Sequence, residues 1–225
     1  MKINIAIDGP SAAGKSTIAK IVAAKLGYVH LDTGAMYRSA ALKASRCGLC
    51  PDDEEAICRM LCDTDIALTP EGRVIMDGED VSEAIRTDEN SLAASRVSKL
   101  KSVREELVHR QMQMAADKGI IMDGRDIGTV VLPDAEVKVF MTASAKARAE
   151  RRYAQNVALH LPTGSVEEIA EEIAERDLQD MTRKESPLRQ ADDAVLLDTS
   201  NMTIEEAAAF VCSLAEPFVK AGDVK

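Results

Sequence analysis

Four residues near the N-terminus have the types and the spacing that bind polyphosphate. Gly9, Gly14, Lys15 and Ser16 fit the pattern Gly-x-x-x-x-Gly-Lys-Ser/Thr. In such a motif the backbone N–H groups of the loop and of the following helix start converge on one point, and the helix dipole adds positive charge there. The lysine would reach the outer phosphates of a nucleoside triphosphate, and the serine hydroxyl would hold Mg²⁺. The pattern therefore predicts a phosphate-binding loop.

The segments on either side of this loop have the periodicity that the motif requires. Residues 3–7 form a short apolar run that suits a buried parallel strand, and Ile18, Ile21, Val22 and Leu26 recur at helical spacing after the loop. The alternative is a chance match in an ordinary strand–turn–helix. The complete motif and its correct flanks favour phosphate binding.

A second polar group begins a helix directly after a strand. Residues 28–32 are predicted as a buried strand, and Thr33 is expected to cap a helix that runs to about Ser45. Tyr37 and Arg38 follow, so a hydroxyl, a phenol and a guanidinium could form an anion pocket. A capped helix with a surface arginine is the simpler alternative.

An arginine and an aspartate lie between two glycines where another predicted strand ends. The strand covers residues 119–123, and Gly124, Arg125, Asp126, Ile127 and Gly128 follow it. In open parallel sheets, ligands collect at the carboxyl ends of the strands. A ligand-binding pair is therefore the favoured interpretation, and a local ion pair within the loop is the alternative.

Basic side chains dominate the helix predicted over residues 145–159. Arg148 and Arg152 share a face at i, i+4, and Arg151 is their neighbour. A solvated basic patch is the alternative. A phosphate clamp is favoured because the chain is acidic overall and already carries a phosphate-binding loop.

The helix after that is acidic, and three charged residues mark its end. Arg176, Asp180 and Arg183 follow one another at i, i+4 and i+7, which predicts that all three project from one face. They could form a salt-bridged surface or the wall of a ligand site. The spacing alone does not decide between the two.

The elements that must position these residues read as an α/β fold. Strands alternate with helices and are predicted over residues 3–7, 28–32, 119–123, 136–141 and 194–197. Residues 66–69 and 73–76 instead predict an antiparallel hairpin around a turn. Further helices are expected over residues 52–62, 88–100, 102–117 and 204–219. The chain is thus expected to be one domain with five parallel strands, one insertion and one arginine-bearing flap.

The composition excludes several broad classes of function. The 28 basic and 38 acidic residues give a net charge of −10, which argues against broad nucleic-acid binding because that needs a basic face. No apolar run approaches the ~18 residues of a membrane span, and the N-terminus has no signal-peptide core. A cytoplasmic location without a membrane partner is expected.

Four of the five cysteines are close together in the sequence. Cys47-x-x-Cys50 and Cys58-x-x-x-Cys62 invite a zinc interpretation. The gap between the two pairs is short, and Cys58 and Cys62 are one helical turn apart. Small buried thiols are therefore the favoured interpretation.

The motifs narrow the reaction that the chain could catalyse. The guanine-binding string Asn-Lys-x-Asp of GTPases does not occur. Arginines on several separate elements suit transfer between two phosphate-bearing molecules, because phosphoryl transfer depends on positioning and charge neutralisation. This is the pattern of a nucleoside monophosphate kinase.

Over essentially its whole length the chain resembles the bacterial cytidylate kinases. The matching strings are residues 7–11, 14–17, 31–38 and 123–131, together with Glu175-Arg176-Asp177, Asp180 and Arg183. The resemblance implies a P-loop three-layer fold and transfer of the γ-phosphate of ATP to CMP or dCMP, with Mg²⁺. Its expected parts are a core over about 1–32, 118–150 and 168–225, a CMP-binding insertion over about 33–117 and a lid over about 151–167.

The resemblance also implies a role for each candidate residue. The ATP-binding set is Gly9, Pro10, Ser11, Ala12, Ala13, Gly14, Lys15, Ser16 and Thr17, with Ser16 as the Mg²⁺ ligand. The CMP-binding set is Thr33, Tyr37, Arg38, Ser95, Arg104, Arg125, Asp126, Arg176, Asp180 and Arg183. Within it the phosphate grip is Arg38, Arg125 and Arg183, the base-reading set is Thr33, Ser95, Arg104 and Asp126, and the sugar contacts are Arg176 and Asp180. The catalytic set is Lys15, Arg125, Arg148, Arg151 and Arg152.

Two features depart from the family pattern. Many relatives carry Ser where this chain has Thr33, but the hydroxyl is kept, so no change of substrate is expected. The cysteines at 47–62 are not associated with the family. Alternative functions are a P-loop kinase for UMP or a small metabolite, and a non-catalytic nucleotide-binding regulator. The chain is expected to act as a monomer.

Overall fold

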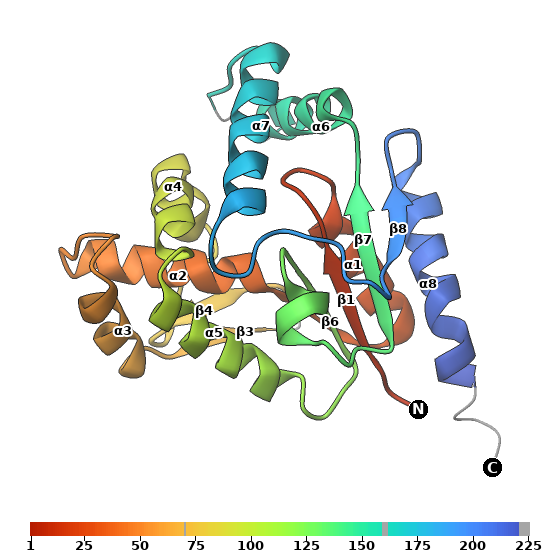
Figure 1. Ribbon diagram of the computed structural model, residues 1–225, viewed down its shortest axis with the longest axis horizontal. Coiled ribbons are helices and arrows are strands. Elements are labelled where there is room, and N and C mark those ends of the chain that lie inside the picture. Colours follow the sequence, from red (N-terminus) through yellow and green to blue (C-terminus); the bar gives the residue numbers. More distant parts are fainter. Residues whose placement is uncertain (70, 159–161, 221–225) are drawn as a thin grey trace. The chain divides into compact units, whose positions relative to one another are not determined.

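The computed structural model describes residues 1–69, 71–158 and 162–220. The main sheet has five parallel strands in the order β2-β6-β1-β7-β8 (Figure 1). Their bounds are β1 Asn4–Asp8, β2 Val29–Asp32, β6 Ile120–Gly124, β7 Val137–Thr142 and β8 Val195–Asp198. The α/β class and the five predicted strands are therefore confirmed, each within one or two residues of its expected bounds.

The chain divides into two compact units. Unit 1 comprises residues 1–28 and 119–225, and unit 2 comprises residues 29–118. Each unit has its own apolar core, as the next paragraphs describe.

The core of unit 1 lies between the central strand and two helices. Ile5 and Ile7 alternate onto one face of β1, and Ile3 directly precedes the strand. All three pack in one apolar cluster with the helices α1 (Lys15–Leu26) and α8 (Ile204–Lys220). Their burial follows from the period-2 geometry of a strand, which puts every second side chain on the same face. The phosphate loop therefore connects two elements, β1 and α1, that are both packed in the apolar core of the unit.

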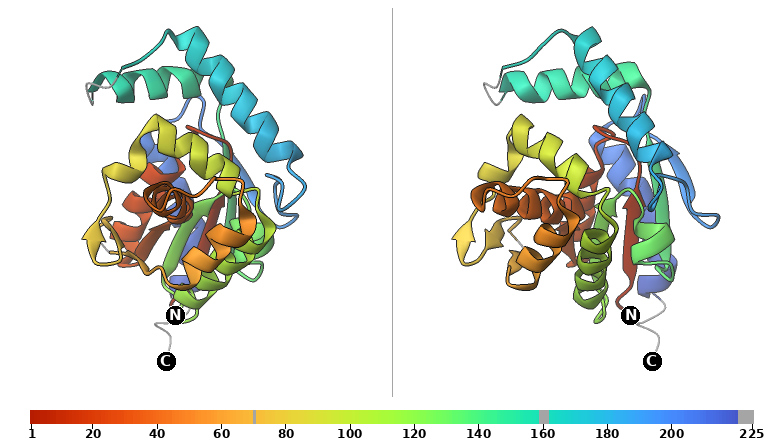
Figure 2. Two further views of the ribbon diagram at one scale, coloured as in Figure 1. Left: turned by 90° about the vertical axis from the view of Figure 1, so that its left-hand side faces the viewer. Right: turned by 60° about the vertical axis from the view of Figure 1, so that its left-hand side comes forward.

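The predicted lid, about residues 151–167, falls on two further helices of unit 1, here called the flap helices. They are α6 (Ala145–Ala158) and α7 (Val166–Thr182), and they lie against each other (Figure 2). Ser165 begins α7 with a reciprocal capping box, because its hydroxyl accepts from the Glu168 N–H while the Glu168 carboxylate accepts from the Ser165 N–H. The predicted residue 159 at the end of α6 lies outside the described residues.

Unit 2 is built from helices and a small antiparallel sheet. The sheet contains β3 Ile66–Leu68, β4 Val74–Met76 and β5 Glu79–Asp80. The helices are α2 Thr33–Arg46, α3 Glu54–Cys62, α4 Asp88–Val97 and α5 Lys101–Met114, with a short 3₁₀ turn at Ala84–Arg86. The predicted hairpin is confirmed, and β5 is a third strand that the sequence did not predict. The helices α4 and α5 each end three residues earlier than predicted.

The N-terminus of α2 corrects one prediction. The capping residue is Asp32, not Thr33, because the Asp32 carboxylate accepts a hydrogen bond from the Ala35 N–H at 3.1 Å. Asp is as good an N-cap as Thr, and Thr33 is the first, buried residue of the helix.

The cysteine prediction was wrong in its main point. Cys47, Cys50 and Cys62 are exposed and Cys58 is half-buried, so these are not buried thiols. Across residues 1–69, 71–158 and 162–220, the structure has no group of three or more His, Cys, Asp or Glu side chains placed to hold a metal ion. The same ranges contain no helix that is both long and apolar enough to span a membrane.

Candidate active site

The phosphate loop depends on a glycine at its first position. Gly9 has φ +150°, and a Cβ there would lie 1.9 Å from the backbone oxygen of Met141 in β7. No side chain can replace it without moving the loop away from β7. Gly14 has φ +94° and begins α1. The two glycines therefore fix the curl that the motif predicted.

Lys15 lies buried within the loop. Its ammonium donates a hydrogen bond to the Pro10 carbonyl at 2.8 Å. Burial, followed by the nearby charge of Arg125, lowers the pKa of Lys15 to about 7, although Asp123, Asp8 and Asp180 oppose the shift. A polyphosphate would favour the charged form, so this lysine is suited to bind an anion.

Ser16 and Asp123 form an oxygen pair at the ends of adjacent elements. The Ser16 hydroxyl donates to the Asp123 carboxylate at 2.6 Å, and Asp123 lies in β6, the strand next to β1. A hydroxyl and a carboxylate beside a phosphate loop are the donors that Mg²⁺ prefers. The residues present therefore fit the predicted metal. Ser16 is a predicted ligand, whereas the sequence motifs assign no role to Asp123.

Asp8 joins the phosphate-loop strand to the segment that follows β6. Its carboxylate accepts hydrogen bonds from the N–H groups of Ile127 and Gly128, both at 2.7 Å. These are the first residues of a short π-helix, η2 (Ile127–Val131), directly after Asp126. Burial raises the pKa of Asp8 to about 6, even though the two backbone hydrogen bonds lower it. Asp8 thus holds the Arg125–Asp126 loop relative to the phosphate loop.

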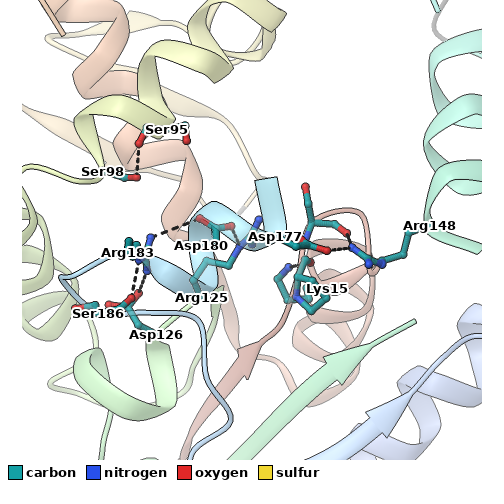
Figure 3. A network of polar contacts seen from close by, with 12 residues as sticks. Lys15, Ser95, Ser98, Arg125, Asp126, Arg148, Asp177, Asp180, Arg183 and Ser186 are labelled. Carbon is teal, nitrogen blue, oxygen red and sulfur yellow. Dashed lines mark hydrogen bonds and ion pairs between the residues drawn. The ribbon is translucent and has the colours of Figure 1, made fainter. Parts of the chain in front are cut away.

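The end of α7 and the Arg125–Asp126 loop form a charged network (Figure 3). Arg125 Nε donates to Asp180 Oδ2 at 2.7 Å, and Arg183 lies 3.7 Å from Asp180 and 3.8 Å from Asp126. Burial would raise the pKa of Asp180, but Arg125, Arg183 and Arg176 together lower it. The structure therefore brings five of the predicted acceptor-binding residues of unit 1 together.

One detail of this network differs from the predicted helix face. Arg183 is not on α7 but one residue beyond it, with extended backbone angles of φ −61° and ψ 143°. Its Nε donates to the Ser186 carbonyl at 2.7 Å. The chain turns at this residue, and the turn, not helical periodicity, brings Arg183 to Asp126.

The flap helices contact the backbone of the phosphate loop. Arg148 on α6 forms an ion pair with Asp177 on α7 (Figure 3). Both side chains form hydrogen bonds with the backbone of Ser11. Arg151 donates to Thr199 and, at 3.4 Å, to the Ala13 carbonyl. Arg152 is half-buried on the same helix. The sequence motifs predict one shared role for the three arginines, as a phosphate clamp, and assign no role to Asp177.

The remaining predicted residues lie in unit 2, on the helices α2, α4 and α5. Arg38 Nη2 donates to Asp32 Oδ2 at 2.8 Å, and its Nε is buried without a hydrogen-bond partner among the described residues. Burial would raise the pKa of Asp32, but the nearby charge of Arg38, together with those of His30 and Arg86 and the hydrogen bond from the Ala35 N–H, lowers it. Arg104 is stacked over the ring of Tyr37 at 5.4 Å from its centroid. Ser95 is half-buried on α4.

The predicted site residues therefore fall into two sets. Unit 1 carries the phosphate loop, the flap arginines and the Arg125–Arg183 network, and unit 2 carries Thr33, Tyr37, Arg38, Ser95 and Arg104. Three of the residues to which the sequence motifs assign no role share one signal. Asp8, Asp32 and Asp123 each stand at or next to the end of an apolar strand, where parallel sheets gather their ligands.

Comparison with known families decides which kind of phosphate-binding protein this is. The family model for cytidylate kinase matches residues 5–216. The chain belongs to the cytidylate kinase family. It is a phosphotransferase of the P-loop kinase type.

Curated members of the family cover almost the whole chain. The cytidylate kinase of Caldicellulosiruptor saccharolyticus is 51% identical over 220 residues, which are 95% of this chain and 95% of that protein. The cytidylate kinase of Bacillus subtilis is 50% identical over 218 residues, 96% of this chain and 97% of that protein. The predicted family resemblance is thus confirmed.

The solved structures add information on the fold. An uncharacterized protein from Eubacterium ventriosum aligns over 96% of this chain and 99% of its own, with a TM-score of 0.53 and 8% identity. At that identity the likeness concerns the fold and not the activity.

Proposed function

We propose that this cytidylate kinase family member transfers the γ-phosphate of ATP to CMP or dCMP, giving ADP and CDP or dCDP. The observation that carries the proposal is the phosphate loop with its buried Lys15, next to a separate arginine–aspartate network that could hold a second phosphate-bearing molecule. A protein that only bound one nucleotide would not need cations on so many elements.

The donor side of the proposed reaction is the loop Gly9–Thr17. Its N–H groups, other than the Ser11 N–H that Asp177 holds, would receive the β- and γ-phosphates, and Lys15 would leave the Pro10 carbonyl to contact them. Ser16 and Asp123 would hold Mg²⁺, which supplies charge neutralisation on these phosphates. Arg148, Arg151 and Arg152 serve this side from the flap.

The acceptor side is assigned to the CMP-binding set. Arg38, Arg125 and Arg183 would grip the CMP phosphate, while Arg176 and Asp180 would contact the sugar. Asp126 would accept from the cytosine amino group, with Arg104, Ser95 and Thr33 completing the base contacts. Each assignment suits the chemistry of the group that it would meet, since guanidinium pairs with phosphate and carboxylate with an amino donor.

The chemical step is an in-line displacement. An oxygen of the CMP phosphate forms a bond to the γ-phosphorus, and the bond from that phosphorus to the β–γ bridging oxygen breaks, so that the electron pair leaves with ADP. The protein's part is to align the two anions and to neutralise the charge that spreads over the transferred group. Lys15 and Arg125 would act on that charge, and the charge of Arg125 is one of the causes that lower the pKa of Lys15.

A coupled assay with ATP and four acceptors tests the proposal. We expect turnover with CMP and dCMP, with kcat/KM at least ~10² higher than with UMP, because a site that pairs with the amino group rejects an analogue lacking it. AMP serves as the purine comparison. Turnover with UMP or a small metabolite alone would indicate a kinase for another acceptor. ATP binding without any product would indicate a regulatory protein.

Lys15→Ala is the matched negative control for this assay. It should lose most of the turnover, by about 10² or more, because the ammonium stabilises charge in the transition state. The far-ultraviolet circular dichroism should stay unchanged, since Lys15 packs into the loop and not into the apolar core. Undiminished turnover would mean that the activity comes from a contaminating kinase.

A cytoplasmic location and a monomeric state are further parts of the proposal. Both derive from the sequence, and gel filtration coupled to light scattering tests the second.

A further inference from the structure

The carbonyl groups of the phosphate loop are held by three cationic side chains. The Pro10 carbonyl accepts from Lys15 at 2.8 Å, the Ser11 carbonyl from Arg148 Nη1 at 3.1 Å, and the Ala13 carbonyl from Arg151 Nη1 at 3.4 Å. Holding these carbonyls fixes the peptide planes of the loop and therefore the directions of the N–H groups that a phosphate would meet. These contacts therefore favour the loop shape that binds phosphate.

Arg148 is the most deeply buried of the three flap arginines. Its side chain is buried, Nε donates to the Ala143 carbonyl at 2.9 Å, and Nη1 serves both the Ser11 carbonyl and the Asp177 carboxylate. A guanidinium with two of its three nitrogens fixed to the protein cannot turn to a moving phosphoryl group without breaking buried bonds.

Asp177 completes the hold on the loop from the second flap helix. Its Oδ1 accepts from the Ser11 N–H at 3.1 Å, while Oδ2 accepts from Arg148. Both polar groups of the Ser11 peptide are thus fixed, one by each member of the ion pair. A carboxylate cannot attract ATP, so its place at this loop indicates a positioning role.

Arg151 and Arg152 differ in how far the protein fixes their guanidinium groups. Arg151 donates to the Thr199 carbonyl at 2.6 Å and to the Thr199 hydroxyl at 3.1 Å, which holds it at the end of β8 beside the loop. Arg152 makes no hydrogen bond or ion pair with any residue that the structure describes. It lies one helical turn beyond Arg148 on the same face of α6.

We propose that the three flap arginines divide two tasks. Arg148, with its partner Asp177, and Arg151 are positioning residues that hold the phosphate loop in its binding shape, whereas Arg152 alone contacts the transferring phosphoryl group. This inference rests on the proposed function for the second task only. The first task can be measured without any acceptor.

Hydrogen exchange and ATP affinity test the positioning task. We expect Arg148→Lys and Asp177→Asn to speed amide exchange in the peptide covering residues 9–17 and to raise the Kd for ATP by ~10-fold, equivalent to the loss of about one buried charge-assisted hydrogen bond. The double variant should raise the Kd for ATP no more than the single variant with the larger effect, because the two side chains act as one unit. Lys146→Gln, which removes an exposed positive charge of α6, is the matched control and should leave both readouts unchanged.

Asp177→Asn distinguishes a role in positioning the phosphate loop from a purely electrostatic effect of the carboxylate on ATP. If Asp177 acted only through its charge, then removing it would strengthen ATP binding, because a negative charge beside the loop repels polyphosphate. Tighter ATP binding in this variant would therefore overturn the proposal. Weaker binding with faster loop exchange would support it.

Steady-state kinetics test the second task. Arg152→Gln should leave loop exchange and the Kd for ATP within ~2-fold of the parent, while kcat falls by ~10² or more, as expected when a cation is lost from a phosphoryl-transfer site. An Arg152→Gln variant with parental kcat, or an Arg148→Lys variant that loses kcat with an unchanged loop, would contradict the division. If the parent binds ATP but forms no CDP, the proposed function fails, while the loop measurements still decide the positioning role.

Discussion

At the scale of single residues, the buried carboxylate of Asp8 is the group with the clearest dependence on pH. Its two hydrogen bonds come from Ile127 and Gly128, and burial raises its pKa from 3.8 to about 6. The folded protein therefore holds this proton more tightly than the unfolded chain does. The contribution of Asp8 to stability is greatest below pH 4, falls between about pH 4 and 6, and is constant above that range.

Asp8→Asn should remove this dependence. The free energy of unfolding of the variant, relative to the parent, should improve by up to ~3 kcal/mol between pH 4 and pH 7, since one pKa unit corresponds to about 1.4 kcal/mol. Urea unfolding at both pH values measures the difference. Parallel stability curves across this range would show that Asp8 does not titrate as the geometry implies.

Gly9 gives a second prediction at this scale, with a matched control in the same unit. Gly9→Ala must displace the loop from β7, because the new Cβ would meet the Met141 backbone oxygen at 1.9 Å. Gly27 also has a positive φ, but a Cβ there meets nothing within 4 Å. Gly27→Ala should therefore cost only the ~1–2 kcal/mol of a left-handed alanine, and Gly9→Ala should cost more and also abolish ATP binding. Thermal unfolding and calorimetric titration compare the two, and equal losses would contradict the clash.

The residues that could be predicted from the sequence are those whose function depends on close neighbours in the chain. Gly9, Gly14, Lys15 and Ser16 lie within one short motif, so their spacing carries the prediction. Asp177 could not be found in this way, because its partner Ser11 is 166 positions away in the chain. Asp8 and Ile127 are likewise 119 positions apart. Only the fold brings such pairs together.

At the scale of elements, the strands were predicted well and the helix ends less well. Apolar runs of parallel strands stand out in the sequence, whereas a helix end depends on which polar group satisfies the first free N–H groups. Asp32 takes that role at α2 in place of the predicted Thr33. The end of α7 shows the same limit. Helical periodicity predicted Arg183 on one face of the helix, but α7 ends at Thr182, one residue before it.

The loop between β6 and η2 carries the prediction on base recognition. Asp126→Asn keeps the size of the side chain but offers an amino group where a carboxylate oxygen stood. The KM for CMP should rise by about 10-fold or more, the KM for ATP should stay within ~2-fold, and UMP should improve relative to CMP because uracil presents an acceptor there. Kinetics with both acceptors measure the ratio. Equal losses for CMP, UMP and ATP would mean that Asp126 does not read the base.

At the scale of the whole molecule, the two units have separate cores and separate shares of the proposed site. Leu107 is fully buried in the core of unit 2, and Val211 is fully buried in the core of unit 1, against the helix that follows the phosphate loop. All residues assigned to ATP lie in unit 1, whereas part of the CMP-binding set lies in unit 2. Damage to one core should therefore affect the two substrates unequally.

Leu107→Ala and Val211→Ala test this separation as a pair. Truncating a buried side chain leaves a cavity, which for Leu→Ala costs ~2–5 kcal/mol and for the smaller Val→Ala less. Leu107→Ala should speed amide exchange most in residues 29–118 and raise the KM for CMP, with the Kd for ATP within ~2-fold of the parent. Val211→Ala should speed exchange most in residues 1–28 and 119–220 and weaken ATP binding. If both variants loosen the whole chain equally, the two cores fold as one cooperative unit, and the division of substrates between them has no separate structural basis.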